Sequence, residues 1–119
     1  MTRILVVDDE PEVARSMERQ LAREGFETSV ATGPQEALAV LEDFSPHLVI
    51  TDCRMPGMSG IQLCAEVRRR RPGTPFIFVS GYPGATVDPG VAAKILQKPW
   101  QKVTLLARIR EELAAGGSP

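Results

Sequence analysis

Short apolar segments alternate with amphipathic segments along this chain. Four short apolar runs are Ile4-Leu5-Val6-Val7, Leu48-Val49-Ile50-Thr51, Phe76-Ile77-Phe78-Val79 and Ile95-Leu96-Gln97. The first three are nearly continuous, which is typical of strands that a sheet buries on both faces. A fifth segment is shorter and more polar, which favours the edge of a sheet. The pattern predicts five strands, over residues 2–7, 27–31, 47–51, 75–79 and 93–97.

Helical periodicity and capping residues mark the segments between these strands. Helices are predicted over residues 11–24, from an N-cap at Thr32 to about residue 43, from an N-cap at Ser59 to about residue 71, and over residues 101–115. Thr32 with Gln35, and Ser59 with Gln62, have the spacing of a capping box, which satisfies free N–H groups of the first turn. In the last helix the stripe expected to face the core is Val103, Leu106, Ile109 and Leu113.

Strict alternation of strands and helices predicts an α/β fold with a parallel sheet covered on both faces. Right-handed crossovers favour a doubly wound, five-stranded sheet of order 2-1-3-4-5, in which strands 1 and 3 flank the point where ligands bind. One crossover departs from the pattern. Residues 80–92 contain three glycines and two prolines, which disfavour a helix interior. A shortened or missing fourth helix is therefore predicted.

Polar side chains stand where four of the predicted strands end. Asp8 and Asp9 follow the first strand, Asp52 the third, Ser80 the fourth and Lys98 the fifth. Because the carboxyl ends of parallel strands meet at one edge of a sheet, these side chains are expected to converge. Three carboxylates, a hydroxyl and an ammonium in one pocket predict a site for Mg²⁺ and a phosphoryl group.

The chemistry of this cluster follows from its charges. Two like charges 4 Å apart repel by about 4 kcal/mol at an effective dielectric constant of 20, so three carboxylates need either a cation beside them or a raised pKa. Mg²⁺ is suited to this task because it takes oxygen ligands and is held by one or two carboxylates together with phosphate. An ionised Asp52 is then able to attack phosphorus and form an aspartyl phosphate. Lys98 and Ser80 would contact the oxygens of the transferred group.

Length and charge limit what else the chain can be. The 119 residues suffice for one domain with a core, and a net charge of −1 provides no basic field for nucleic acid. No apolar stretch approaches the roughly 20 residues of a membrane span, and no signal peptide is evident. Cys53 and Cys64 lack metal-ligand spacing, so we expect reduced thiols in a cytoplasmic protein.

The motifs around these strand ends resemble the receiver domain of bacterial two-component response regulators. They are Val-Val-Asp-Asp-Glu-Pro (6–11), Thr-Asp-Cys-Arg-Met-Pro-Gly-Met-Ser-Gly (51–60), Val-Ser-Gly-Tyr (79–82) and Gln-Lys-Pro-Trp (97–100). They occur in family order, and at family spacing except for the short fourth crossover. The resemblance implies a flavodoxin-like fold over residues 1–115 and a role in phosphorelay signal transduction. Residues 116–119 would be a flexible tail or the start of a linker.

The resemblance also implies a role for each site residue. Asp52 would accept a phosphoryl group from the phosphohistidine of a sensor histidine kinase or of a histidine phosphotransfer protein. Asp9, Asp52 and the main-chain carbonyl of Arg54 would bind Mg²⁺ directly, and Asp8 would act through water. Lys98 would pair with Asp52 or with its phosphate.

The switch that follows phosphorylation is implied in the same way. Ser80 matches the family's switch hydroxyl, which moves to bind the phosphate. The Lys98–Pro99 bond would be cis, an isomer found in only about 5–6% of X-Pro bonds. The position three residues before the lysine is often Tyr or Phe in receivers and rotates inward on activation. This chain has Ile95 there, without a ring or a hydroxyl.

Two other classes of function compete with this interpretation. A phosphatase of the haloacid dehalogenase type also uses a nucleophilic Asp, but it needs a second Asp two residues later, where this chain has Arg54. An interaction module that works without phosphorylation is disfavoured by the intact Asp9, Asp52, Ser80 and Lys98. The chain is thus expected not to be an enzyme. Whether it stands alone, is a piece of a hybrid kinase or phosphodiesterase, or forms a homodimer stays open.

Overall fold

A computed structural model describes residues 1–81 and 94–116. Five parallel strands form one sheet of order β2-β1-β3-β4-β5. In chain order the elements are β1 (Arg3–Val7), α1 (Pro11–Arg23), β2 (Glu27–Ala31), α2 (Pro34–Phe44), β3 (Leu48–Asp52), α3 (Gly60–Arg70), β4 (Phe76–Ser80), β5 (Ile95–Gln97) and α5 (Lys102–Gly116). The predicted doubly wound, flavodoxin-like sheet is confirmed. The predicted shortening of a fourth helix falls on residues 82–93, outside the described residues.

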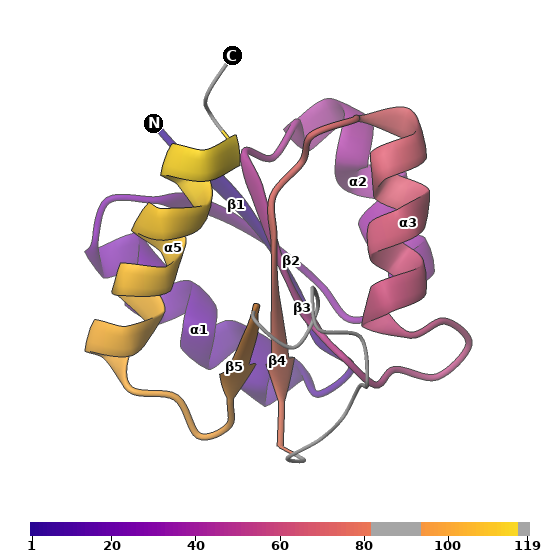
Figure 1. The fold of residues 1–119 in the computed structure, drawn as a ribbon. Helices are drawn as coiled ribbons and strands as arrows, with labels where there is room; N and C mark the ends of the chain where they lie inside the picture. The colour runs from indigo at the N-terminus through magenta and orange to yellow at the C-terminus, as the bar shows by residue number, and fades with distance from the viewer. Residues whose placement is uncertain (82–93, 117–119) are drawn as a thin grey trace.

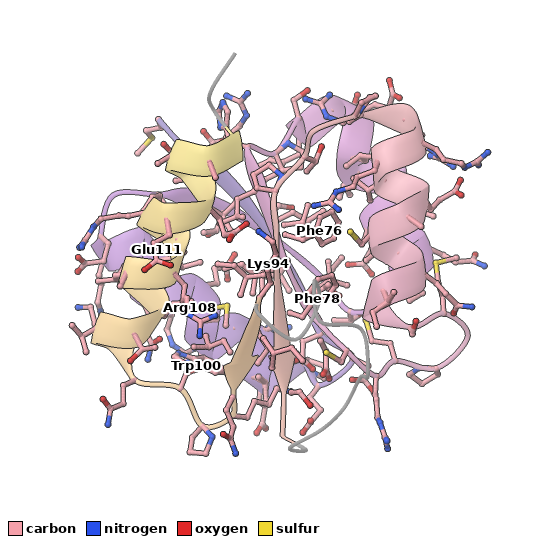
Figure 2. The ribbon with its side chains drawn as sticks, viewed as in Figure 1. Phe76, Phe78, Lys94, Trp100, Arg108 and Glu111 are labelled. Carbon is pink, nitrogen blue, oxygen red and sulfur yellow. The ribbon has the colours of Figure 1, made fainter. Side chains whose placement is uncertain are left out.

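The sheet separates two apolar layers, as its continuous apolar strands require. Helices α1 and α5 cover one face, and α2 and α3 cover the other (Figure 1). Because successive strand residues point to opposite faces, Ile4 and Val6 pack with the first pair of helices, and Leu5 and Val7 with the second. Figure 2 shows the same division, with Phe76 and Phe78 on the α2–α3 side and Trp100 on the α1–α5 side.

The capping box predicted at the start of α3 is confirmed. The Ser59 hydroxyl accepts the Gln62 N–H at 3.2 Å, and the Gln62 side chain accepts the Ser59 N–H at 2.9 Å. The second predicted cap was wrong, because α2 begins at Pro34 and Gly33 is its N-cap. Thr32 lies one residue too early to cap, and its hydroxyl instead donates to Glu36 Oε2 at 3.4 Å.

Helix α5 buries the second half of the predicted stripe, Ile109 and in part Leu113, but not its start. Leu105 and Ile109 are fully buried, whereas Val103 is 71% exposed. The first two steps of the predicted stripe are three residues each, short of the 3.6 residues of a turn, so Val103 falls off the core face. Leu105 and Ile109 are four residues apart and stay on the face that packs on the sheet. Leu113 lies partly buried against the same cluster.

None of the helices among the described residues is both long enough and apolar enough to span a bilayer.

We expect Leu105→Ala to lower the free energy of unfolding by about 2–5 kcal/mol, because it opens a cavity in a fully buried site. Val103→Ala should change it by less than about 0.5 kcal/mol, as expected for an exposed side chain. Urea denaturation of both variants measures the difference. Equal costs for the two substitutions would contradict the observed face of α5.

Candidate functional site

The carboxyl ends of β1, β3, β4 and β5 bring the predicted site residues together. Register places Val7 beside Thr51, Asp52 beside Val79 and Ser80 beside Gln97. The polar residues at these positions or just after them therefore share one edge of the sheet. They surround a cleft of about 440 Å³ lined by Asp9, Glu10, Asp52, Arg54, Ser80, Gly81 and Lys98.

Three carboxylates gather at this edge. Asp8, Asp9 and Asp52 each offer an oxygen, and these oxygens lie within 4.8 Å of one another. Asp8 and Asp52 are buried, and Asp9 is the more accessible of the three. Asp8 and Asp52 are oriented by main-chain groups two residues further along. Asp8 Oδ1 accepts the Glu10 N–H at 2.9 Å, and Asp52 Oδ1 accepts the Arg54 N–H at 3.5 Å.

Lys98 reaches this cluster from β5, two strands away from β3. Its Nζ donates to Asp8 Oδ2 at 3.0 Å and to Asp52 Oδ2 at 3.3 Å. The predicted pairing of Lys98 with Asp52 is present, but the shorter contact is to Asp8. Glu10 Oε1 lies 3.9 Å from the same ammonium. The sequence did not single out Glu10, whose side chain is 66% exposed.

Burial and charge act in opposite directions on the two central groups. Burial raises the pKa of Asp52, and the neighbouring Asp8 charge raises it further, while Lys98 lowers it. Burial lowers the pKa of Lys98. The hydrogen bond and charge of Asp8, followed by the charge of Asp52, outweigh this effect and raise the pKa above its usual value. The Lys98 ammonium is thus held in its charged form. The ionised form of Asp52 is disfavoured by burial and by Asp8, and a further cation would stabilise it.

The donor set suits a hard divalent cation. Carboxylate oxygens this close together are the ligands that Mg²⁺ prefers, and the accessible Asp9 leaves the cluster open towards the cleft. Ser80 is buried and lines the same cleft, as a group placed to contact a phosphoryl oxygen would. Arg54 lines the cleft at the start of the turn after β3.

Gly60 is a positioning residue that the sequence analysis missed. A Cβ atom at this position would lie 2.2 Å from the main-chain oxygen of Asp52 and 3.2 Å from Thr51 Cγ2. The Gly60 N–H also donates to the Cys53 carbonyl at 3.0 Å. The first turn of α3 can therefore lie directly against the end of β3 only without a side chain. The signal was present in Ser59-Gly60, but it was interpreted only as a helix start.

The predicted cis bond between Lys98 and Pro99 is present. Ile95, at the position where receivers often have an aromatic residue, lies beside Phe78 in the sheet and packs against the cluster under α2 and α3. Cys53 and Cys64 are free cysteines, and both are buried. Burial raises the pKa of both thiols.

The chain is similar in sequence to a known family of signalling proteins. A family model described as the response regulator receiver domain matches residues 4–110. The DNA-binding response regulator MtrA of Mycolicibacterium smegmatis is 36% identical over 116 residues, which cover 93% of this chain and 50% of MtrA. The chain thus spans about half the length of the curated mycobacterial relatives it matches.

Solved structures agree over nearly the whole chain. A CheY-like receiver domain protein from Methanospirillum hungatei is 31% identical with a TM-score of 0.86, covering 98% of this chain and 97% of that one. The response regulator TrrA from Thermotoga maritima, solved in complex with Mg²⁺ and BeF, is 31% identical with a TM-score of 0.84. That match covers 93% of this chain and 98% of TrrA.

We expect Gly60→Ala to destabilise the domain by about 1–3 kcal/mol, because the new methyl group meets main-chain atoms that cannot rotate away. Gly81→Ala is the control, because nothing lies within 4 Å of its added Cβ. Thermal denaturation of both variants measures the difference. A Gly60→Ala protein as stable as the control would mean that α3 moves away from β3 at no cost.

Proposed function

Because this chain belongs to the response regulator receiver family and so to the proteins of phosphorelay signal transduction, we propose that Asp52 is its phosphoacceptor. The observation that carries the proposal is the position of Asp52 at the floor of a cleft. It is buried, paired with Lys98, and grouped with Asp8 and Asp9. A carboxylate buried among like charges lacks an evident structural purpose but is suited to nucleophilic attack.

The proposed reaction is transfer of a phosphoryl group from a phosphohistidine. An Oδ atom of Asp52 attacks phosphorus, and an O–P bond forms as the P–N bond to the donor imidazole breaks. The electron pair of that bond returns to the imidazole nitrogen. The product is an acyl phosphate on Asp52. Lys98 lies within 3.3 Å of the reacting carboxylate, where it would balance the charge on the phosphoryl oxygens.

Mg²⁺ is the cofactor that fits the donor set. Asp9 and Asp52 would bind it directly, together with the main-chain carbonyl of Arg54, and Asp8 would act through water. When bound, the ion supplies charge neutralisation to the carboxylates and to the incoming phosphoryl group. Asp8 already shares its carboxylate with Lys98 at 3.0 Å, which supports an indirect role for Asp8.

The acyl phosphate would act as a switch through its neighbours. Ser80 would supply a hydroxyl to one phosphoryl oxygen and Lys98 an ammonium to another, both as charge-assisted hydrogen bonds. Moving a two-state switch from 1:99 to 99:1 requires about 5.5 kcal/mol of differential stabilisation, of which these contacts would provide a part. The surface around residues 80–98 would then change its affinity for a protein target.

The partners belong to the same proposal. A sensor histidine kinase or a histidine phosphotransfer protein in the cytoplasm would donate the phosphoryl group. The receiver would occupy residues 1–115, followed by a tail or linker at residues 116–119. The curated relatives are about twice as long as this chain. The proposal therefore concerns the receiver alone and assigns no activity to the remainder of a longer protein.

We expect the wild type to gain one phosphoryl group when incubated with Mg²⁺ and a small phosphoramidate, as measured by intact-protein mass spectrometry. Asp52→Asn should gain none, because the amide is not a nucleophile. Asp43→Asn, an exposed carboxylate on α2, is the matched control and should be labelled like the wild type. Labelling of Asp52→Asn at the wild-type rate would overturn the assignment of Asp52.

Removal of one predicted ligand tests the metal site. Asp9→Asn should weaken Mg²⁺ binding by roughly tenfold or more, because it removes a carboxylate that would contact the ion. Glu10→Gln removes the adjacent charge, which lies outside the three-carboxylate cluster, and should have a much smaller effect. NMR titration with Mg²⁺ gives both dissociation constants. Equal weakening in the two variants would indicate a general effect of charge rather than a ligand.

A further inference from the structure

The segment that carries Lys98 leaves the sheet between β5 and α5. Strand β5 ends at Gln97 and α5 begins at Lys102. On the sheet side, the Lys98 N–H donates to the Ser80 carbonyl at 2.8 Å. This bond fixes the start of the segment, but it leaves the residues beyond Lys98 to be fixed by something else.

The side of this segment that faces α1 is open. A cavity of about 380 Å³ lies between the start of α1, with Glu12, Val13 and Ser16, and residues Lys98, Pro99 and Trp100. The cavity makes packing on this side of the segment loose. The position of the Trp100 ring therefore depends on its contact with the apolar cluster under α1 and α5 and on a directed interaction.

Gln20 of α1 provides that interaction. The Trp100 indole N–H donates to Gln20 Oε1 at 2.8 Å, in a partly buried environment. The rest of the ring packs against the apolar cluster under α1 and α5, and Figure 2 shows Trp100 on this side of the sheet. A buried indole N–H needs an acceptor, and losing it leaves a donor unsatisfied.

A second, weaker contact joins the residue after α1 to the first residue of α5. Lys102 Nζ lies 3.0 Å from Glu24 Oε2, and both side chains are substantially exposed. Surface ion pairs of this kind contribute little. The partly buried hydrogen bond is therefore the main polar anchor between α1 and this segment among the described residues. Only Pro99, whose ring restricts the backbone, separates Trp100 from Lys98.

We propose that Gln20 is a positioning residue for the phosphoryl site, which acts by holding Trp100 and thereby fixing the ammonium of Lys98 between Asp8 and Asp52. This inference rests on the proposed phosphoacceptor function. Gln20 contacts none of the site residues itself. Its effect reaches them through Trp100 and through Pro99, which connects Trp100 to Lys98.

The test distinguishes an effect on the position of Lys98 from an effect on Mg²⁺ binding or on the stability of the fold. Gln20→Met keeps the length of the side chain but removes the acceptor, and Gln20→Glu retains an acceptor. Calorimetry measures the affinity for Mg²⁺ alone, and then for beryllofluoride with Mg²⁺ saturating. We expect Gln20→Met to weaken beryllofluoride binding by roughly three- to tenfold, as expected for the loss of one hydrogen bond, without weakening Mg²⁺ binding. Gln20→Glu should restore wild-type affinity.

Trp100→Phe removes the same hydrogen bond from the other side and keeps a ring in the core. It should reproduce the effect of Gln20→Met, and the double variant should bind beryllofluoride no more weakly than either single variant, because the two share one interaction. Additive losses would overturn the proposal. So would Gln20→Met binding beryllofluoride like the wild type.

A second measurement does not depend on phosphoryl chemistry. Reductive methylation followed by mass spectrometry reports how accessible each lysine amine is, and Lys94, which pairs with Glu112 at 2.6 Å, is the internal reference. Gln20→Met should speed methylation of Lys98 but not of Lys94. An unchanged rate at Lys98 would overturn the proposal. A wild type that fails to bind beryllofluoride would instead refute the proposed function and leave the labelling result to decide the role of Gln20.

Discussion

Repulsion among three carboxylates at one edge of the sheet is the constraint on which this site depends. The parallel arrangement of β1 and β3 places Asp8, Asp9 and Asp52 within 4.8 Å of one another. Like charges this close are tolerated only beside a cation. Lys98 supplies part of the compensation through contacts of 3.0 Å and 3.3 Å, and the remaining charge explains why the site suits Mg²⁺.

This constraint makes the position of β5 important for chemistry as well as for folding. Lys98 comes from the edge strand, which has only three residues, yet its ammonium must reach across β4 to the carboxylates at the centre of the sheet. The sheet holds the segment through Ser80, and α1 holds it through Trp100. The segment that follows β5 is thus contacted from the sheet by the main chain of Ser80 and from one helical layer by Gln20.

Ile95 occupies a position where receivers often have an aromatic residue. It lies beside Phe78 and packs under α2 and α3, where an aliphatic side chain has no ring to rotate between two positions. Its contacts belong to the layer opposite Trp100. The proposed phosphoryl site is contacted by Lys98 from the end of β5, and Trp100, two residues further along, contacts α1. The position where many receivers have an aromatic residue is filled by a compact apolar one.

The sequence by itself predicted the strand order, the convergence of polar side chains at one edge of the sheet and the cap at Ser59, because these follow from local periodicity and from the rule that parallel strands end at one edge. Tertiary structure decided the rest. Burial of Leu105 in place of Val103, the preference of Lys98 for Asp8, and the contact between Gln20 and Trp100 each join residues whose spacing in the chain carries no signal. Such contacts depend on how the helices pack against the sheet, and a pattern of single residues does not encode that geometry.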